Sequence, residues 1–225
     1  MVIRTRTRPD DGQAEREEGF TLMELLVATF TGLIVLGAGV TLVSQVQRGY
    51  TSQLENAAIQ EEARFAVDWI AREIMSAGSN PYGVTVSDCP TPGTDFIAVR
   101  PDPNRDASHD DIRINADAGI PNGLLGGEGG TCSEANEDIT IALDYARRTI
   151  TRHDNNIEPT PVPMTDGVIT RLEFTYLDIN RVATRNPAGV MFVQVEVTAE
   201  GDAMNPQTGD VDTYTARSEV RLKAR

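Results

Sequence analysis

The sequence predicts an α+β fold in which one long N-terminal helix packs on an antiparallel β-sheet. Two observations predict this fold. Apolar residues recur with helical spacing as far as Ala77, and from Tyr82 onward the pattern changes to alternation with a period of two. With 225 residues, of which 40% are hydrophobic, the chain has enough material for one globular domain and an appendage.

The first half of the predicted helix is apolar on every side. Leu25–Gln47 contains 23 residues and no charge. As a helix it would span roughly 35 Å, which is enough to cross the core of a bilayer. A cleaved signal peptide has a shorter apolar run of about 7–15 residues. The segment therefore favours a retained transmembrane helix, ending near residue 47, over a signal peptide.

Basic residues indicate the orientation of this helix. The positive-inside rule counts Lys and Arg and gives acids little weight. Few basic residues follow the apolar run, whereas four arginines precede it: Arg4, Arg6, Arg8 and Arg16. We therefore expect a cytoplasmic N-terminus and a β-rich domain, residues 79–225, on the outer side of the membrane.

The two cysteines fall in predicted loops of this outer part. Cys89 and Cys132 would then lie in an oxidising compartment. A disulfide between them is the favoured interpretation, and two free thiols are the alternative. The bridge would close a loop of 44 residues (132 − 89 + 1), for which loop-closure entropy gives roughly 4 kcal/mol of stabilisation.

The second half of the helix is amphipathic. Gly78 is a typical C-cap residue and Pro81 cannot continue a helix, so the whole helix is predicted to run from Thr21 to Ala77. Phe65 and Trp69, four residues apart, are predicted to anchor the core. The apolar positions recur at steps of three and four: Ala58, Ala63, Ala66, Val67, Ile70, Ile74 and Ala77.

Alternating residues predict the strands. Ile169–Asp178, Val190–Glu200 and Tyr214–Lys223 are expected to form the sheet that packs on the Ala58–Ala77 face of the helix. A polar loop, Asp202–Asp212, would join the last two. Shorter strands are predicted at Thr94–Arg100 and Asp111–Asn115, and as a hairpin of Ile139–Leu143 and Arg148–Arg152.

Glu24 is an acid inside the apolar stretch. A carboxylate at membrane depth costs at least ~2.5 kcal/mol and is a functional hypothesis by default. The alternative is that Glu24 lies at the level of the lipid headgroups and is simply solvated.

The residues around Glu24 resemble the processing site of type IV prepilins and pseudopilins. That site is a Gly, then usually Phe, then Thr-Leu-x-Glu-Leu-x-Val at the start of a long apolar helix, as in Gly19-Phe20-Thr21-Leu22-Met23-Glu24-Leu25-Leu26-Val27-Ala28. The resemblance implies that a prepilin peptidase cuts after Gly19 and that the new amine of Phe20 is methylated. Residues 1–19 would then be a cytoplasmic leader peptide, and residues 20–78 the long helix. The leader departs from many others in carrying acids just before Gly19.

The same resemblance supplies a partner for Glu24. Cleavage would create a positive amine on Phe20, which lies four residues before Glu24 in the same helix. In an assembling filament, the amine of one subunit could instead meet Glu24 of a neighbour. Either pairing compensates a charge that is expensive to bury alone.

A second stretch narrows the family. It is similar to PilW-type minor pilins, which carry Ala-Arg-Phe-Ala-x-Asp-x-(Ile/Leu)-Ala-Arg-(Asp/Glu)-Ile-x-x-Ala-Gly, here Ala63–Gly78. The implied fold is pilin-like, and the implied role is structural: a single-pass protein of the bacterial inner membrane, with a periplasmic domain, that joins other major and minor pilins in a pilus. The alternatives are a type II secretion pseudopilin of the J type and a membrane-tethered periplasmic binding module.

Other functional classes have little support. The net charge is −14 and no Lys/Arg cluster is present, which argues against nucleic-acid binding. No Gly-x-Ser-x-Gly, His-Glu-x-x-His or phosphate-binding loop occurs, so no enzyme is expected and no cofactor is certain.

One loop suggests calcium. Asp102, Asn104, Asp106 and Asp110 place oxygens at alternate positions, as in the front half of an EF-hand loop. Ala107 stands where Gly allows the sharp turn, and Arg113 replaces the bidentate Glu. Asp111 or a distant acid could compensate. The alternative is a solvated acidic loop without a metal.

Overall fold

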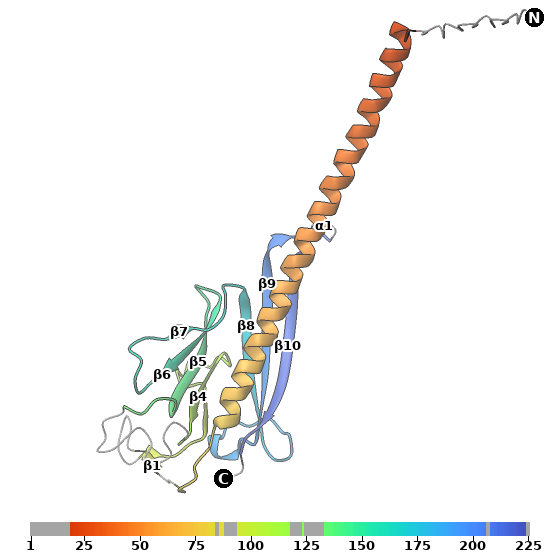
Figure 1. Cartoon of the computed structure of the whole chain (residues 1–225). Helices are drawn as coiled ribbons and strands as arrows, with labels where there is room; N and C mark the ends of the chain where they lie inside the picture. Colours follow the sequence, from red (N-terminus) through yellow and green to blue (C-terminus); the bar gives the residue numbers. More distant parts are fainter. Residues whose placement is uncertain are drawn as a thin grey trace, which may run out of the picture. The chain divides into compact units, whose positions relative to one another are not determined.

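The computed structural model describes residues 19–83, 86–87, 94–117, 123, 133–205 and 208–223. The chain divides into two compact units, Met1–Arg48 and Gly49–Arg225. A single helix, α1 (Leu22–Ser76), contributes to both units (Figure 1). Its ends agree with the predicted Thr21–Ala77 to within one residue. No proline lies within it, so every residue of the helix has a backbone N–H to donate.

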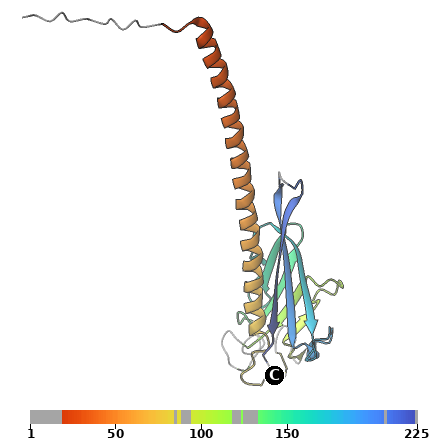
Figure 2. The ribbon, with the colours of Figure 1, turned by 90° about the vertical axis from the view of Figure 1, so that its right-hand side faces the viewer.

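Within the second unit, one face of α1 is buried against the strands. Figures 1 and 2 show this part of the helix running along the three-stranded sheet. The buried positions are spaced by one to four residues and form one stripe: Ile59, Ala63, Ala66, Val67, Trp69, Ile70, Ala71 and Ile74. The stripe confirms the predicted amphipathic half except at its start, where Ile59 is buried and the predicted Ala58 is exposed.

Phe65 corrects one prediction. Trp69 belongs to the core and is 8% exposed, as expected, but Phe65 is 45% exposed. Each helical residue turns about 100° from the previous one. Phe65 therefore projects beside the stripe that its neighbour Ala66 occupies, and it is not a core anchor.

Gly78 ends the helix as predicted. Its φ of +74° is a left-handed conformation that glycine adopts without strain. The Gly78 N–H donates to the Asn115 carbonyl at 3.0 Å, which ties the helix end to the five-stranded sheet. A Cβ at this position would also approach Ala98 Cβ to 3.1 Å.

The three-stranded sheet has the order β10-β9-β8, with all strands antiparallel. Its strands are β8 (Ile169–Leu177), β9 (Phe192–Met204) and β10 (Val211–Arg221). In β9, Val193, Val195 and Val197 are buried and Gln194 is exposed, which confirms the predicted alternation. Before β9 lies a short 3₁₀ turn, η2 (Pro187–Gly189), capped by Asn186.

The predicted polar loop between the last two strands is too long. β9 continues to Met204, and β10 already begins at Val211, opposite it. Cross-strand pairing therefore extends through residues whose polarity suggested a loop. The Asp202 N–H also donates to Glu55 Oε1 at 2.8 Å, which fixes this end of the hairpin to α1.

The second sheet is antiparallel with the order β3-β4-β5-β6-β7. The hairpin predicted around residues 144–147 is present, and Asp111–Asn115 is a strand with the predicted bounds. The strands are β3 (Val99–Pro101), β4 (Asp111–Asn115), β5 (Asp138–Asp144), β6 (Thr149–Asp154) and β7 (Val162–Pro163).

The strand predicted at Thr94–Arg100 is divided in two. Its first part is β2 (Thr94–Asp95), which pairs with β1 (Val86–Ser87), and its end belongs to β3, which pairs with β4. The chain leaves one sheet for another between these parts, so a single strand cannot form. The apolar faces of the two larger sheets and of α1 share one core.

Candidate functional site

The predicted processing junction lies just before the first turn of α1. Gly19, Phe20 and Thr21 are not helical, and Phe20 is 83% exposed. Thr21 caps the helix: its Oγ1 accepts the Glu24 N–H at 3.2 Å, and its carbonyl accepts the Leu25 N–H at 3.1 Å. The Gly19–Phe20 peptide bond is therefore in non-helical chain, directly in front of a capped helix.

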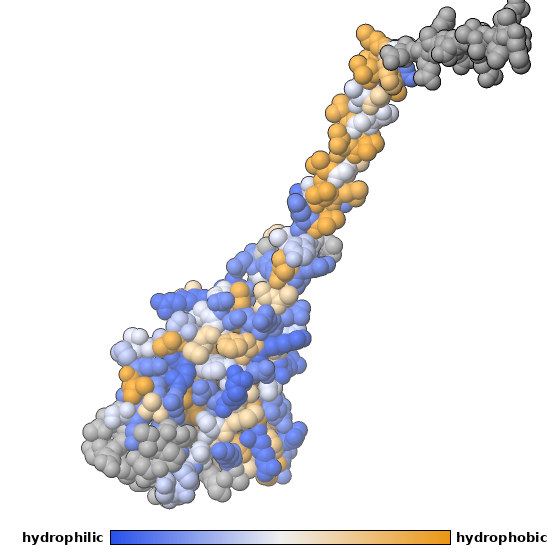
Figure 3. All heavy atoms as spheres, in the orientation of Figure 1, coloured by the Kyte–Doolittle hydropathy of each residue, from blue (hydrophilic) through white to orange (hydrophobic). Residues whose placement is uncertain are grey.

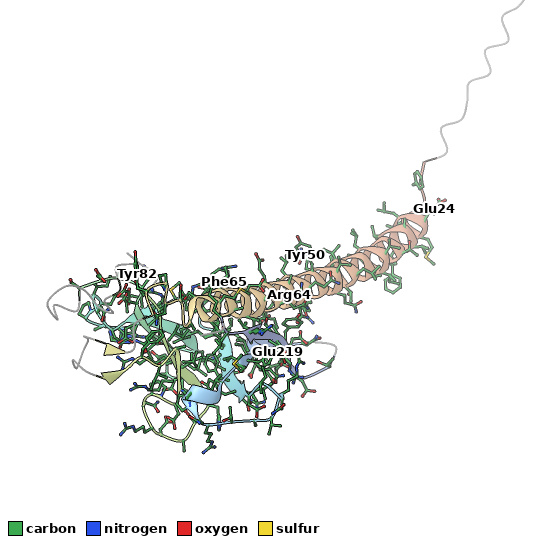
Figure 4. All side chains as sticks on the ribbon, turned by 90° about the horizontal axis from the view of Figure 1, so that it is seen from below. Glu24, Tyr50, Arg64, Phe65, Tyr82 and Glu219 are labelled. Carbon is green, nitrogen blue, oxygen red and sulfur yellow. The ribbon has the colours of Figure 1, made fainter. Side chains whose placement is uncertain are left out.

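Glu24 occupies the third position of this helix, where a carboxylate is favoured. Thr21 and Glu24 have the spacing of a capping box, and the partial positive charge of a helix N-terminus attracts an acid. Figure 4 shows Glu24 at the start of the helix. The sequence motif suggested the carboxylate, but it did not reveal that Thr21 acts as the cap. Stabilisation of the helix N-terminus would by itself explain why a carboxylate stands at position 24. A role of Glu24 in assembly therefore needs a separate test.

The helix surface that follows is apolar and exposed. Figure 3 shows hydrophobic side chains along this part of α1. No residue of its apolar stretch is buried, and α1 is long and apolar enough to cross a membrane. Among the exposed side chains are Leu25, Phe30, Leu33, Val40 and Val46.

Hydroxyl groups in this stretch are paired within the helix. Thr31 Oγ1 donates to the Val27 carbonyl at 2.8 Å, and Ser44 Oγ donates to the Val40 carbonyl at 2.9 Å. In a hydrocarbon environment, an unpaired hydroxyl is costly. The pairing therefore makes these positions compatible with lipid or with a bundle of apolar helices.

The predicted metal residues lie in the loop between β3 and β4. Their oxygens are engaged by backbone N–H groups of the loop itself: Asp102 Oδ1 and Asn104 Oδ1 both accept the Asp106 N–H, at 3.0 and 2.9 Å. Asp106 Oδ1 accepts the Ser108 N–H at 2.7 Å, and Ser108 Oγ donates to Asp110. Among the described residues, no group of three or more His, Cys, Asp or Glu side chains is placed so that it could hold a metal ion as it stands.

Asp111, the first residue of β4, is the acid of this region whose surroundings the sequence does not reveal. It is 2% exposed, and its Oδ1 is buried without a hydrogen-bond partner. Burial raises the pKa of the Asp111 carboxyl to about 6, with smaller contributions from Asp110, Asp102 and Asp106; the Asn104 N–H opposes the rise. The negative charges of the loop therefore add to the effect of burial and raise the pKa of this one acid further.

A groove of about 510 Å³ lies between the second half of α1, the segment that precedes β8 and the end of β9. Its rim is acidic, but two of the acids have structural roles. Glu62 Oε1 accepts the Asp166 N–H at 2.8 Å, and Glu55 Oε1 accepts the Asp202 N–H. A Cβ on Gly201 would come within 2.6 Å of Glu55 Oε1, so a side chain at this position would displace the Glu55 carboxylate.

Cys89 and Cys132 lie outside the described residues, so their pairing stays a prediction. Peptide mapping of the unreduced protein should recover both cysteines in one cross-linked pair, and reduction should separate them. Complete alkylation of both thiols in native protein that has never been reduced would contradict the bridge.

Comparisons with known proteins identify no relative of this chain. No protein-family model matches the sequence, and the searches of curated proteins and of solved structures find no match. What the chain shows by itself is one long N-terminal helix, apolar enough to span a membrane, and antiparallel sheets on which its second half packs.

Proposed function

We propose that this protein is a structural minor pilin of PilW type, with a pilin-like fold. It would be inserted in the bacterial inner membrane by α1, cleaved after Gly19 by a prepilin peptidase, and assembled with other pilins into a type IV pilus, as a priming or tip subunit. The observation that carries the proposal is the Gly19–Phe20 junction in front of an uncharged apolar helix with Glu24 in its first turn.

The local geometry supports this function. A peptidase needs an accessible peptide bond, and Gly19 and Phe20 are exposed and not helical. An assembling subunit needs a helix that can leave the lipid and pack among similar helices. The 23 uncharged residues from Leu25 to Gln47, with their hydroxyls paired internally, fit both environments.

The charges of the first turn support it further. A free amine on Phe20 would lie at the positive end of the helix, where the helix dipole disfavours it. Glu24 is the acid in this turn, and no Lys or Arg lies between Arg16 and Arg48. The carboxylate is therefore positioned to offset the amine, either within one subunit or between two.

The first test is the N-terminus of the mature protein. Mass spectrometry of protein from membranes that contain active prepilin peptidase should show a chain of 206 residues (225 − 19) that starts at Phe20 and carries one methyl group. Gly19→Val should keep the intact chain, because the resemblance makes a glycine at this position the determinant of cleavage.

Gly32→Val is the matched control. Like Gly19, Gly32 has open space where a Cβ would stand, since nothing beyond its immediate chain neighbours and the nearby helix backbone lies within 4 Å, but it lies well past the junction, inside α1. It should be cleaved as the unaltered protein is. An intact Met1 terminus in the unaltered protein would instead support a membrane-tethered binding module. Co-purification with secretion components in place of pilins would favour a pseudopilin of the J type.

A further inference from the structure

The loop of residues 102–111, here called the acidic loop, has a concentration of charge that the proposed function does not use. It contains four aspartates and one arginine, Arg105. Three residues of the loop have positive φ without being glycine: Asp102 at +47°, Arg105 at +61° and Ala107 at +68°. The loop folds back on itself: Asp102 Oδ2 accepts the Ala107 N–H at 3.1 Å, and Asn104 Nδ2 donates to Asp106 Oδ2 at 3.0 Å.

Asp111 is the last residue of the acidic loop, and its environment points to a ligand. Its side chain is buried, and its Oδ1 has no hydrogen-bond partner. The Asn104 N–H and the carboxylates of Asp102 and Asp106 all act on its charge, so the Asp111 carboxylate faces the loop. A buried carboxylate with an unsatisfied oxygen is costly unless a cation or a donor compensates it.

The backbone prevents Asp111 from escaping to solvent. It is the first residue of β4 and pairs with Ala142 of β5. Its carbonyl accepts the buried Tyr176 hydroxyl at 3.2 Å. The nearest cation along the strand, Arg113, does not compensate it, because the Arg113 guanidinium is bound to Asp138.

We propose that the acidic loop binds one calcium ion and that Asp111 supplies the closing carboxylate, in place of the glutamate that is missing at the position of Arg113. Calcium takes six to eight oxygen ligands in flexible geometry. The loop offers six oxygen-bearing side chains, which are Asp102, Asn104, Asp106, Ser108, Asp110 and Asp111.

The described acids of the loop are not grouped around one point as they stand, so binding requires a local rearrangement of their side chains. Asp102, Asn104 and Asp106 are engaged by N–H groups of the loop, and Asn104 and Asp106 are exposed, so their side chains can rotate toward an ion. Asp110 and Asp111 are buried and would stay in place. Magnesium fits less well, because it demands near-ideal octahedral geometry and dehydrates reluctantly.

The experiment uses the full chain in detergent, stripped of metal with a chelator. Unfolding is followed by the fluorescence of Trp69, which is the single tryptophan and is buried in the core. Millimolar calcium should raise the thermal midpoint by several degrees, magnesium should raise it less, and calorimetry should show one calcium per chain.

Two variants test the assignment of ligands. Asp106→Asn keeps an oxygen that can accept the Ser108 N–H but loses a charge, and it should weaken calcium binding at least about tenfold. Asp111→Asn should unfold no earlier than the unaltered chain without calcium, because it removes a buried uncompensated charge, yet it should lose the gain that calcium gives.

Asp178→Asn is the matched control. Asp178 Oδ1 also accepts two backbone N–H groups, those of Asn180 and Val182, but it lies in another loop, after β8. It should respond to calcium as the unaltered chain does. The proposal is overturned if calcium leaves the midpoint of the unaltered chain unchanged, if magnesium acts equally, or if the two loop variants keep the full response.

Discussion

Glu24→Ala and Glu24→Gln should be cleaved normally and should then fail to assemble. Each variant is expressed with its partner pilins, its mature N-terminus is determined, and its co-purification with those pilins is measured. We expect incorporation to fall at least about tenfold in both variants, because removing one partner of a buried ion pair leaves the other charge uncompensated. The N-terminus at Phe20 should be unchanged, since Gly19 and Phe20 are the local determinants of cleavage.

The physical reason for the expected assembly defect is that the environment of Glu24 changes during assembly. In front of the membrane core, the Glu24 carboxylate can be hydrated and is favoured by the helix N-terminus. When the helix packs among other helices, hydration is lost and the carboxylate needs a cation. The described part of α1 contains no basic residue before Arg48, so the amine of Phe20 is the available partner.

The two substitutions separate charge from shape. Glu24→Gln keeps the length of the side chain and its acceptor oxygen, and it can still cap the helix. If it assembles while Glu24→Ala does not, the capping role is sufficient. If both assemble at the unaltered level, Glu24 is only a solvated residue at the interface. Asp68→Asn, which removes an exposed carboxylate from the second half of the same helix, is the control and should assemble normally.

The fold was largely predictable because its main elements have strong local patterns. The single stripe on α1 and the alternation of Val193, Val195 and Val197 each required one apolar face, and the structure buries both. Local patterns could not assign Phe65, which lies at the side of the stripe. They also could not show that the segment at Thr94 is shared between two sheets, because that depends on pairing with β1 and β4.

The candidate sites also differ in how far the sequence alone could predict them. Gly19, Phe20 and Glu24 are adjacent in sequence, so a linear motif is enough to find them. The importance of Asp111 is not local, because it depends on contacts with distant strands: Asp111 pairs with Ala142 of β5, and its backbone carbonyl accepts the Tyr176 hydroxyl of β8. A sequence read without the fold shows an acidic loop, and only the fold shows which acid lacks a partner.

Ile70→Ala should destabilise the second unit by about 2–5 kcal/mol, through lost burial and the cavity that remains. Ile70 is fully buried in α1 and belongs to the core that the helix shares with both larger sheets. The measurement is urea unfolding of the full chain in detergent, followed by Trp69 fluorescence. Ile179→Ala, at a position that is 63% exposed, is the control and should change the free energy of unfolding by less than about 0.5 kcal/mol.

This substitution also separates folding from assembly. Ile70→Ala should lower the yield of folded protein while leaving Gly19, Phe20 and Glu24 untouched, so the molecules that do fold should be cleaved and incorporated. Glu24→Ala should do the opposite: unfolding of the second unit stays the same, and incorporation is lost. If Ile70→Ala changes stability by less than about 1 kcal/mol, the helix is not the structural support of the sheets. If Glu24→Ala lowers stability as much as Ile70→Ala does, its assembly defect is only a consequence of misfolding.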